Sequence, residues 1–205
     1  MPFLQGNLGF FLFPNTHSTQ NCEFILCVGV TFVDYWYVFA VQVGSEEKVR
    51  DLLIQKLDTS KEFHPFIPMK EKQIKRQGKR VKEKTICFPG HIFIMSNLIF
   101  EKFIAKTFPT IFSIKQIIKL LNYDGKTGSA MKEDEKHFLS KLLGNHFCIE
   151  ESRGFFENGN THIISGSLVG MENVIKCVNI HYRTVKIEFD FMGSKELLTV
   201  GFDFA

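Results

Sequence analysis

Seven histidines and five cysteines are the residues of this chain that could carry acid–base, nucleophilic or metal chemistry. The histidines form no HExxH or comparable metal motif, and the scattered cysteines form no CxxC pair. The stretch NYDGKTGS lacks the GxxxxGK[ST] spacing of a phosphate loop, and GSLVGME is not the GxSxG turn of a hydrolase. We therefore predict no enzyme, no metal and no cofactor, and keep a small nucleic-acid enzyme only as a remote alternative.

A basic run is the strongest charge feature of the sequence. Between Lys61 and Thr85 there are nine Lys or Arg residues and three Glu, whereas the whole chain carries only +3. A local basic patch suits a polyanionic partner better than the global charge implies. Two interpretations of its centre, QIKRQGKRVKEK, remain open: a solvated loop, or a hairpin that faces nucleic acid or a polymerase.

Length and composition indicate an ordinary globular protein. The 205 residues suffice for one medium domain or two small ones, and 44% of them are hydrophobic. An odd number of scattered cysteines fits free thiols in a reducing cytoplasm, where we place the chain.

The first 34 residues stand apart from the rest. They contain two acids and no Lys or Arg, so they lack the basic start of a secretory signal. The span from Phe24 to Val43 is apolar, but Asp34 interrupts it and its second half predicts a strand. We expect residues 1–34 to be a non-native or poorly ordered leader and expect no membrane anchor.

The segment from 35 to 145 is predicted to form an α+β domain. WYVFAVQV (36–43) predicts a strand, and a helix with an apolar stripe follows Ser45. Further helices are expected over 96–108, stopped before Pro109, and over 131–144, capped by Gly144, with a strand over 114–121 between them. TICFPGHIFI (85–94) predicts a buried strand, although Pro89-Gly90 at its centre are the residues that strands tolerate least.

The pattern changes near residue 146. The stretch EESRGFFENGN is rich in turn residues and predicts a linker, which we place at 146–153. Four short strands follow, over THIIS, NVIKCVNI, RTVKIEFDF and LLTVGFDF, and predict a small all-β barrel over 154–205.

Three segments in this order resemble the NusG family of transcription elongation factors: WYVFAVQVGSEEKVRDLL, FPGHIFIMSN and GSLVGMENVIKCVNIHYRTVKIEFDFMG. The resemblance runs from about Trp36 to Phe204. It implies an N-terminal NGN domain, with an antiparallel sheet flanked by helices, followed by a C-terminal KOW β-barrel. The barrel turn corresponds to Gly166, Leu168, Gly170 and Asn173, where Asn173 replaces the family's last glycine and is expected to tolerate its positive φ.

Within the family, the chain is most similar to LoaP-type antiterminators, and more loosely to the UpxY and RfaH types. The general factor usually carries Gly-Arg-x-Thr-Pro late in its barrel, where this chain has FMGSKELLTVGFDF. The resemblance to the LoaP type implies a monomeric factor that acts on selected operons and reads an RNA hairpin in the nascent leader, suppressing pausing and termination.

The resemblance also implies where RNA polymerase binds. In the family, a concave aromatic patch holds the tip of the polymerase clamp helices, and Pro89-Gly90 would lie at the start or bulge of a strand rather than in its hydrogen-bonded middle. The bend would push Phe88 and His91, which replaces the family's tyrosine, out beside Trp36 and Tyr37. The expected polymerase-binding residues are Trp36, Tyr37, Phe88, Pro89, Gly90, His91 and Phe93. The alternative is that these aromatics are simply core.

The barrel is the implied RNA-binding part. His181-Tyr182-Arg183 fall at an expected turn, and a cation beside an aromatic side chain is a common way to engage RNA. The candidate RNA-binding residues are Lys176, His181, Tyr182, Arg183, Lys186 and Lys195. Two alternatives stay open: a solvated hairpin tip, or a barrel that binds a termination factor or ribosomal protein as in general members of the family.

Overall fold

The computed structural model describes residues 34–57, 62–123, 129–157 and 160–204. The leader predicted over residues 1–34 lies, except for Asp34, outside these ranges. Within them, no helix is long and apolar enough to cross a membrane.

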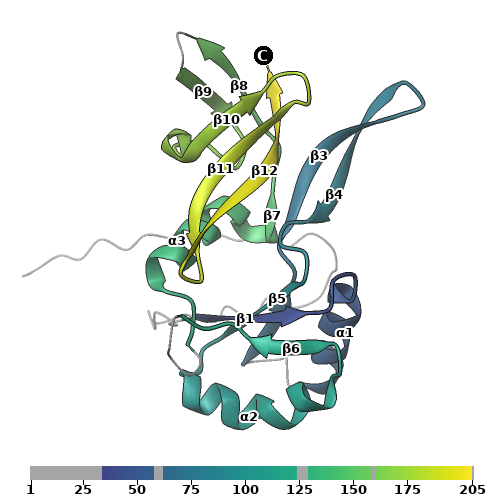
Figure 1. Ribbon diagram of the computed structural model, residues 1–205, viewed down its shortest axis with the longest axis vertical. Helices are drawn as coiled ribbons and strands as arrows, with labels where there is room; N and C mark the ends of the chain where they lie inside the picture. The colour runs from purple at the N-terminus through teal and green to yellow at the C-terminus, as the bar shows by residue number, and fades with distance from the viewer. Residues whose placement is uncertain (1–33, 58–61, 124–128, 158–159, 205) are drawn as a thin grey trace, which may run out of the picture. The chain divides into compact units, whose positions relative to one another are not determined.

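A four-stranded sheet with the order β2-β5-β1-β6 forms the centre of the N-terminal half (Figure 1). Its strands are β1 (Tyr35–Val41), β2 (Phe63–Phe66), β5 (His91–Ser96) and β6 (Ile117–Leu120). β5 pairs antiparallel with both β1 and β2, and β6 pairs antiparallel with β1. The strands expected over 36–43 and 114–121 are confirmed as β1 and β6.

Strand β1 is buried on both faces, which explains its unbroken run of apolar residues. On one face, Tyr37 and Phe39 pack with helices α1 (Glu46–Lys56) and α2 (Phe100–Ser113), which cover that side of the sheet (Figure 1). On the other face, Trp36 and Val38 belong to a second apolar cluster. The alternation of side chains along a strand thus gives β1 two separate cores.

Helix α2 differs from its prediction. We expected a helix over 96–108 that stopped before Pro109, but α2 runs from Phe100 to Ser113 with Pro109 inside it. Proline removes one helical hydrogen bond. The helix nevertheless continues because its apolar face is anchored on the sheet at both ends, by Phe103, which is fully buried, and by its C-cap Ile114.

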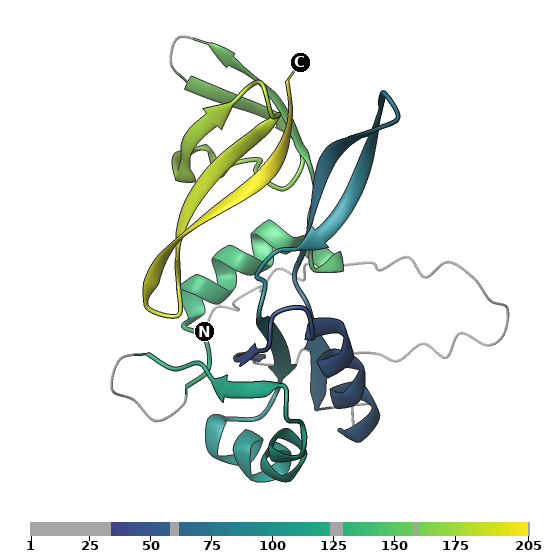
Figure 2. The same ribbon diagram turned by 45° about the vertical axis from the view of Figure 1, so that its right-hand side comes forward.

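The basic run forms a two-stranded hairpin, drawn as a long ribbon in Figure 2. Its strands are β3 (Met69–Arg76) and β4 (Lys79–Ile86), joined only by Gln77 and Gly78. Both turn residues have positive φ, 50° and 78°, as the tightest hairpin turns require. A loop interpretation of this run is therefore wrong, since the basic residues lie on regular strands.

Helix α3 (Glu133–Leu143) follows, and Gly144 is its C-cap with φ 58°, as predicted. The span 146–153, expected to be a linker, contains β7 (Cys148–Ile149), which pairs parallel with β3, and the first residues of β8 (Ser152–Glu157). The last three strands of the chain are β10 (Ile175–Asn179), β11 (Thr184–Phe191) and β12 (Ser194–Phe204).

A five-stranded sheet with the order β10-β11-β12-β8-β9 completes the described chain. The four expected strands are present, the first as β9 (Asn160–Ser165), but β8 was missed. The turn-like composition of β8 has a packing cause: a Cβ on Gly154 would lie 2.0 Å from the His162 carbonyl oxygen of β9. Only glycine permits this close approach.

Candidate functional site

The Phe88-Pro89-Gly90-His91 turn joins β4 to β5. Gly90 has φ 78°, and a Cβ there would lie 3.1 Å from Val43 Cγ2. Its N–H donates to the buried Glu46 Oε1 at 2.6 Å, and its carbonyl accepts the Val41 N–H at 2.8 Å. Pro89-Gly90 therefore lie between two strands and not within one, as the family resemblance implied.

We call Trp36, Phe66, Phe88 and Phe93 the aromatic face, because they meet on the side of the four-stranded sheet that α1 and α2 do not cover. The ring centroids of Trp36 and Phe66 are 5.2 Å apart, and those of Phe88 and Phe93 are 5.7 Å apart. Tyr37 was expected beside them but lies in the helix-covered core, stacked on Phe103 at 3.8 Å. Its hydroxyl donates to the Leu98 carbonyl at 2.8 Å, so it is positioned as a core residue.

The tip of the β11–β12 hairpin covers the Phe88 and Phe93 side of the aromatic face. Phe191 stacks on Phe88 with a centroid distance of 4.9 Å and nearly parallel rings, and it also contacts His91 edge-on. Phe88 is consequently only 8% exposed, whereas Pro89 remains on the surface. A cavity of about 410 Å³ remains between the Phe88 turn and the hairpin. The aromatic face is thus formed but closed in this structure.

Glu135 of α3 anchors this hairpin tip. Its buried carboxylate accepts the Tyr123 hydroxyl at 2.6 Å and the backbone N–H of Met192, in the hairpin turn, at 3.0 Å. Burial, reinforced by the bond to Glu135, raises the pKa of Tyr123 above its ordinary value. Hydrogen bonds to a buried carboxylate are worth more than neutral ones, so this anchor favours the closed arrangement.

The six predicted RNA-binding residues form two groups. Lys176, Lys186 and Lys195 are exposed on the strands β10, β11 and β12, where Lys176 pairs with Glu188 at 3.3 Å and Lys195 with Asp190 at 3.4 Å. These ion pairs neutralise much of the charge on that surface.

The other three form the turn between β10 and β11. Tyr182 is 71% exposed and its ring meets His181 edge-on at 5.0 Å. Arg183 was expected to be exposed with them, but its guanidinium is bonded to Asp203. The turn therefore presents two aromatic rings and one neutralised cation.

The turn expected at Gly166, Leu168, Gly170 and Asn173 is built mostly as the sequence suggests. Gly166 and Gly170 have positive φ, and the buried Leu168 donates its N–H to Ser152 Oγ at 3.0 Å. Asn173 does not have the expected positive φ, and it lies in a 3-10 helix, η2 (Glu172–Val174). The expectation that asparagine replaces a left-handed glycine here is wrong, because this position no longer needs one.

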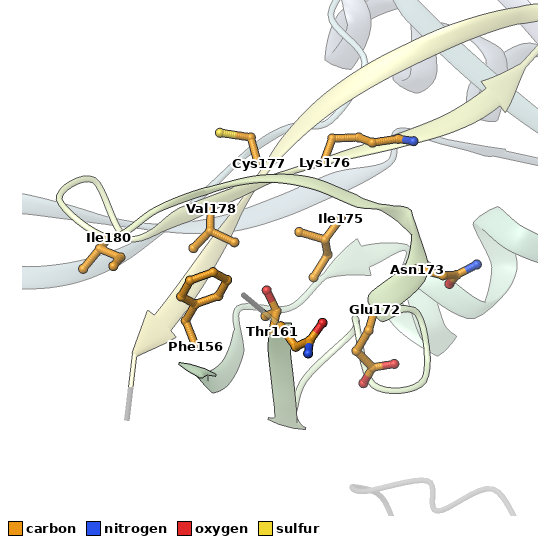
Figure 3. A pocket seen from close by; sticks show the side chains of 10 residues that line it. Phe156, Thr161, Glu172, Asn173, Ile175, Lys176, Cys177, Val178 and Ile180 are labelled. Atoms are coloured by element: carbon orange, nitrogen blue, oxygen red, sulfur yellow. The ribbon is translucent and has the colours of Figure 1, made fainter. Parts of the chain in front are cut away.

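A groove of about 640 Å³ separates the edge strands β9 and β10 (Figure 3). Figure 3 shows the side chains of Ile175 and Val178 pointing from β10 toward Phe156 and Thr161, whereas Lys176 and Cys177 point to the other side of the strand. Phe156 is 48% exposed, so this groove combines an exposed apolar wall with the two strands that, in the part of the chain that the structure describes, lie at the edges of the sheet.

Comparison with known families matches residues 34–139, just over half of the chain, to the family described as transcription termination factor nusG. The chain belongs to the NusG family. It is also similar to the solved structure entitled "Domain interaction in Thermotoga maritima NusG", with a TM-score of 0.50 and 18% identity over 82% of this chain and 94% of that chain. At this identity the structural match shows the fold alone. A comparison with curated proteins found no match.

As a NusG-family transcription factor, the chain has two positioning residues that the sequence did not reveal, Glu46 and Glu135. Both lie in the first turn of a helix, where acids are common on the solvent side because they favour the helix dipole. Nothing in the pattern marked them as buried. Across the described ranges, no three His, Cys, Asp or Glu side chains gather as a metal site would require.

The thiols of this NusG-family chain should differ in reactivity. Burial raises the pKa of Cys87 to about 12, and burial likewise raises the pKa of Cys148, whereas Cys177 is exposed. Iodoacetamide at pH 8 should therefore alkylate Cys177 and spare Cys87 and Cys148. Peptide mapping by mass spectrometry measures each site separately, and rapid alkylation of Cys87 in the native chain would contradict the packing around Phe88.

The raised pKa of Cys87 also predicts how the free energy of unfolding depends on pH. Its thiol ionises near its ordinary value of 9.0 in the unfolded chain but only near 12 in the folded chain. Above pH 9 the folded state therefore binds the extra proton, and the free energy of unfolding should fall as the pH rises toward 12. A Cys87→Ser variant should show a weaker decline in urea titrations across this range.

Proposed function

We propose that this chain is an operon-specific antitermination factor of the cytoplasm. Its NGN-like part, residues 35–145, binds the clamp helices of RNA polymerase, and its KOW-like part, residues 154–205, binds a hairpin in nascent leader RNA. The chain suppresses pausing and termination without making or breaking a bond. It acts by binding one conformational state of the polymerase more tightly than another, which is the only way a ligand shifts such an equilibrium.

The observation that carries this proposal is the aromatic face beside the Phe88 turn. The rings of Phe88 and Phe93 contact each other at a tilt, with centroids 5.7 Å apart, and Trp36 meets Phe93 edge-on at 6.2 Å. Gly90 and Glu46 fix the turn that carries Phe88. Aromatic anchors in a preformed pocket carry most of the binding energy in a helix-in-groove contact. Because Phe191 occupies this pocket, binding of the clamp helices requires the β11–β12 tip to move away.

A terminator read-through assay tests the proposal. It uses purified bacterial RNA polymerase, the full chain, and two templates that differ only in the leader upstream of the chain's own gene. Read-through on the leader-bearing template alone supports an operon-specific antiterminator. Equal read-through on both templates would overturn the leader-specific part and leave a general elongation factor.

The groove between β9 and β10 favours a second candidate function, that of a general elongation factor. A general NusG-type elongation factor would use this C-terminal sheet to hold a termination factor or a ribosomal protein, and an exposed apolar groove between two free strand edges suits a protein partner. A substitution of the groove-lining Phe156 to Ser distinguishes the two. It should leave leader-dependent read-through unchanged if RNA is the ligand.

A further inference from the structure

A cleft separate from the Phe88 cavity and from the β9–β10 groove lies between the β3–β4 hairpin and the turn that follows β10. Its volume is about 410 Å³. The hairpin and the turn contribute three lining residues each, namely Gln73, Ile74 and Arg80, and His181, Tyr182 and Arg183. No carboxylate lines it among the residues that the structure describes. The cleft therefore joins the basic hairpin, whose role the sequence left open, to the aromatic turn.

Close backbone packing holds the two walls together. β12 passes so near β3 that a Cβ on Gly201 would lie 2.8 Å from the Glu71 carbonyl oxygen. Lys70 Nζ donates to the Thr199 carbonyl at 2.9 Å, and Gln73 Nε2 donates to Glu151 Oε2 at 3.0 Å. These contacts tie the hairpin to both β12 and the start of the C-terminal sheet.

The two walls offer complementary chemistry. On the hairpin, Arg80 is exposed and has no ion-pair partner among the described side chains, whereas Arg76 and Lys82 are paired with glutamates. On the turn, Tyr182 presents an open ring, and Arg183 is neutralised by Asp203. Among the described residues, a guanidinium with no ion-pair partner and an unstacked aromatic ring thus line one cleft that has no acid in its wall.

This pairing fits an unpaired nucleotide. Single-stranded bases stack on exposed aromatic rings, and arginine binds the adjoining phosphate with paired hydrogen bonds. A base inside a duplex has no free face to stack, so a duplex would not use Tyr182. An acidic peptide would use Arg80 and leave the ring without a function.

We propose that this cleft binds an unpaired loop nucleotide of the RNA ligand, with its base on Tyr182 and its phosphate on Arg80. The proposal rests on RNA binding by the C-terminal sheet and adds that the β3–β4 hairpin of the NGN-like part forms one wall of the same site. RNA recognition and the polymerase-binding part of the chain are then physically joined.

The test measures RNA affinity of the full chain by fluorescence anisotropy. The probe is a labelled RNA hairpin from the leader upstream of the chain's own gene, used alone and with its loop annealed to a complementary oligonucleotide. The variants are Arg80→Ala, Arg80→Lys and Tyr182→Ala, and the control is Lys102→Ala, which removes an exposed cation on α2. All three substituted sites are exposed, and circular dichroism confirms that each of the four variants is folded.

Tyr182→Ala should weaken binding about 5- to 150-fold, the range for loss of one stacked base. Arg80→Ala should weaken it about 10-fold and lower the slope of log affinity against log salt by about 0.7, the value for one single-strand phosphate contact. Arg80→Lys should keep most of the salt slope because the charge remains. Annealing the loop should weaken wild-type binding as much as Tyr182→Ala does.

The outcomes separate this inference from the proposed function. If the wild-type chain binds the leader hairpin no better than a shuffled RNA of equal length, the RNA-binding part of the proposed function fails. A second outcome is that the chain binds the leader RNA specifically and Tyr182→Ala weakens binding, but Arg80→Ala behaves as Lys102→Ala does. RNA binding then stands, and the β3–β4 hairpin of the protein is not part of the site.

Discussion

Phe88→Ala and Phe191→Ala are expected to change the affinity for RNA polymerase in opposite directions. Phe88 is the proposed anchor for the clamp helices, and loss of a buried aromatic anchor costs about 2 kcal/mol or more, roughly 30-fold in affinity. Phe191 only covers that anchor in the closed chain. Its removal should raise the population that is competent to bind, and with it the affinity, by about 2- to 13-fold, since a stacked aromatic pair contributes about 0.5–1.5 kcal/mol.

Biolayer interferometry with immobilised core RNA polymerase measures both effects. Phe108→Ala is the matched control, because Phe108 is a half-exposed phenylalanine on α2, away from the aromatic face. The alkylation rate of Cys87, which is 3% exposed beneath the same cover, reports the opening independently and should rise in Phe191→Ala. Wild-type affinity in Phe88→Ala would refute the assignment of the anchor, and unchanged affinity in Phe191→Ala would refute the cover.

Gly166→Ala is expected to be among the most damaging single substitutions in the C-terminal sheet. Gly166 has φ 96°, and an added Cβ would lie 2.4 Å from Ser152 Cα and 2.6 Å from the Glu151 carbonyl oxygen. Backbone strain and overpacking each cost about 1–3 kcal/mol, so the free energy of unfolding should fall by about 2–6 kcal/mol.

The matched control is Gly44→Ala, since Gly44 has a similar φ of 85° but nothing within 4 Å of the added Cβ. This variant should lose only the strain, about 1–2 kcal/mol. Urea titrations of both variants measure the difference. Equal losses would mean that the approach of Gly166 to β8 contributes nothing beyond its backbone conformation.

Local patterns predicted much of this fold. The aromatic and β-branched run of β1, the Gly144 cap of α3 and the turn signals between the C-terminal strands each express a short-range preference, and each is confirmed. Predictions failed where tertiary packing outweighed that preference. α2 continues through Pro109 because its apolar face is held on the sheet, and β8 looked like a linker because Gly154 serves a close strand approach.

The candidate site was predictable in kind but not in arrangement. The residues alone predicted one buried strand over 85–94, which is wrong, and only the resemblance to the NusG family placed Pro89-Gly90 at the start or bulge of a strand. Trp36 and Tyr37 are neighbours on β1 and point to opposite faces, so strand alternation already excluded one of them from the aromatic face. The neutralisation of Arg183 depends on Asp203 on another strand, and such a long-range pairing leaves no trace in local spacing.

The two-residue turn at Gln77-Gly78 restricts how the β3–β4 hairpin can vary in length among homologues. Its strands pair residue for residue from Met69↔Ile86 to Arg76↔Lys79, and this register places Arg80 at the cleft. A change that adds or removes one residue on each strand keeps the remaining residues paired across the hairpin, whereas a change on one strand alone shifts the register. Insertions or deletions that preserve the cleft should therefore come in even numbers of residues. An odd number indicates a homologue with a different turn, or one in which the β3–β4 hairpin no longer lines the cleft.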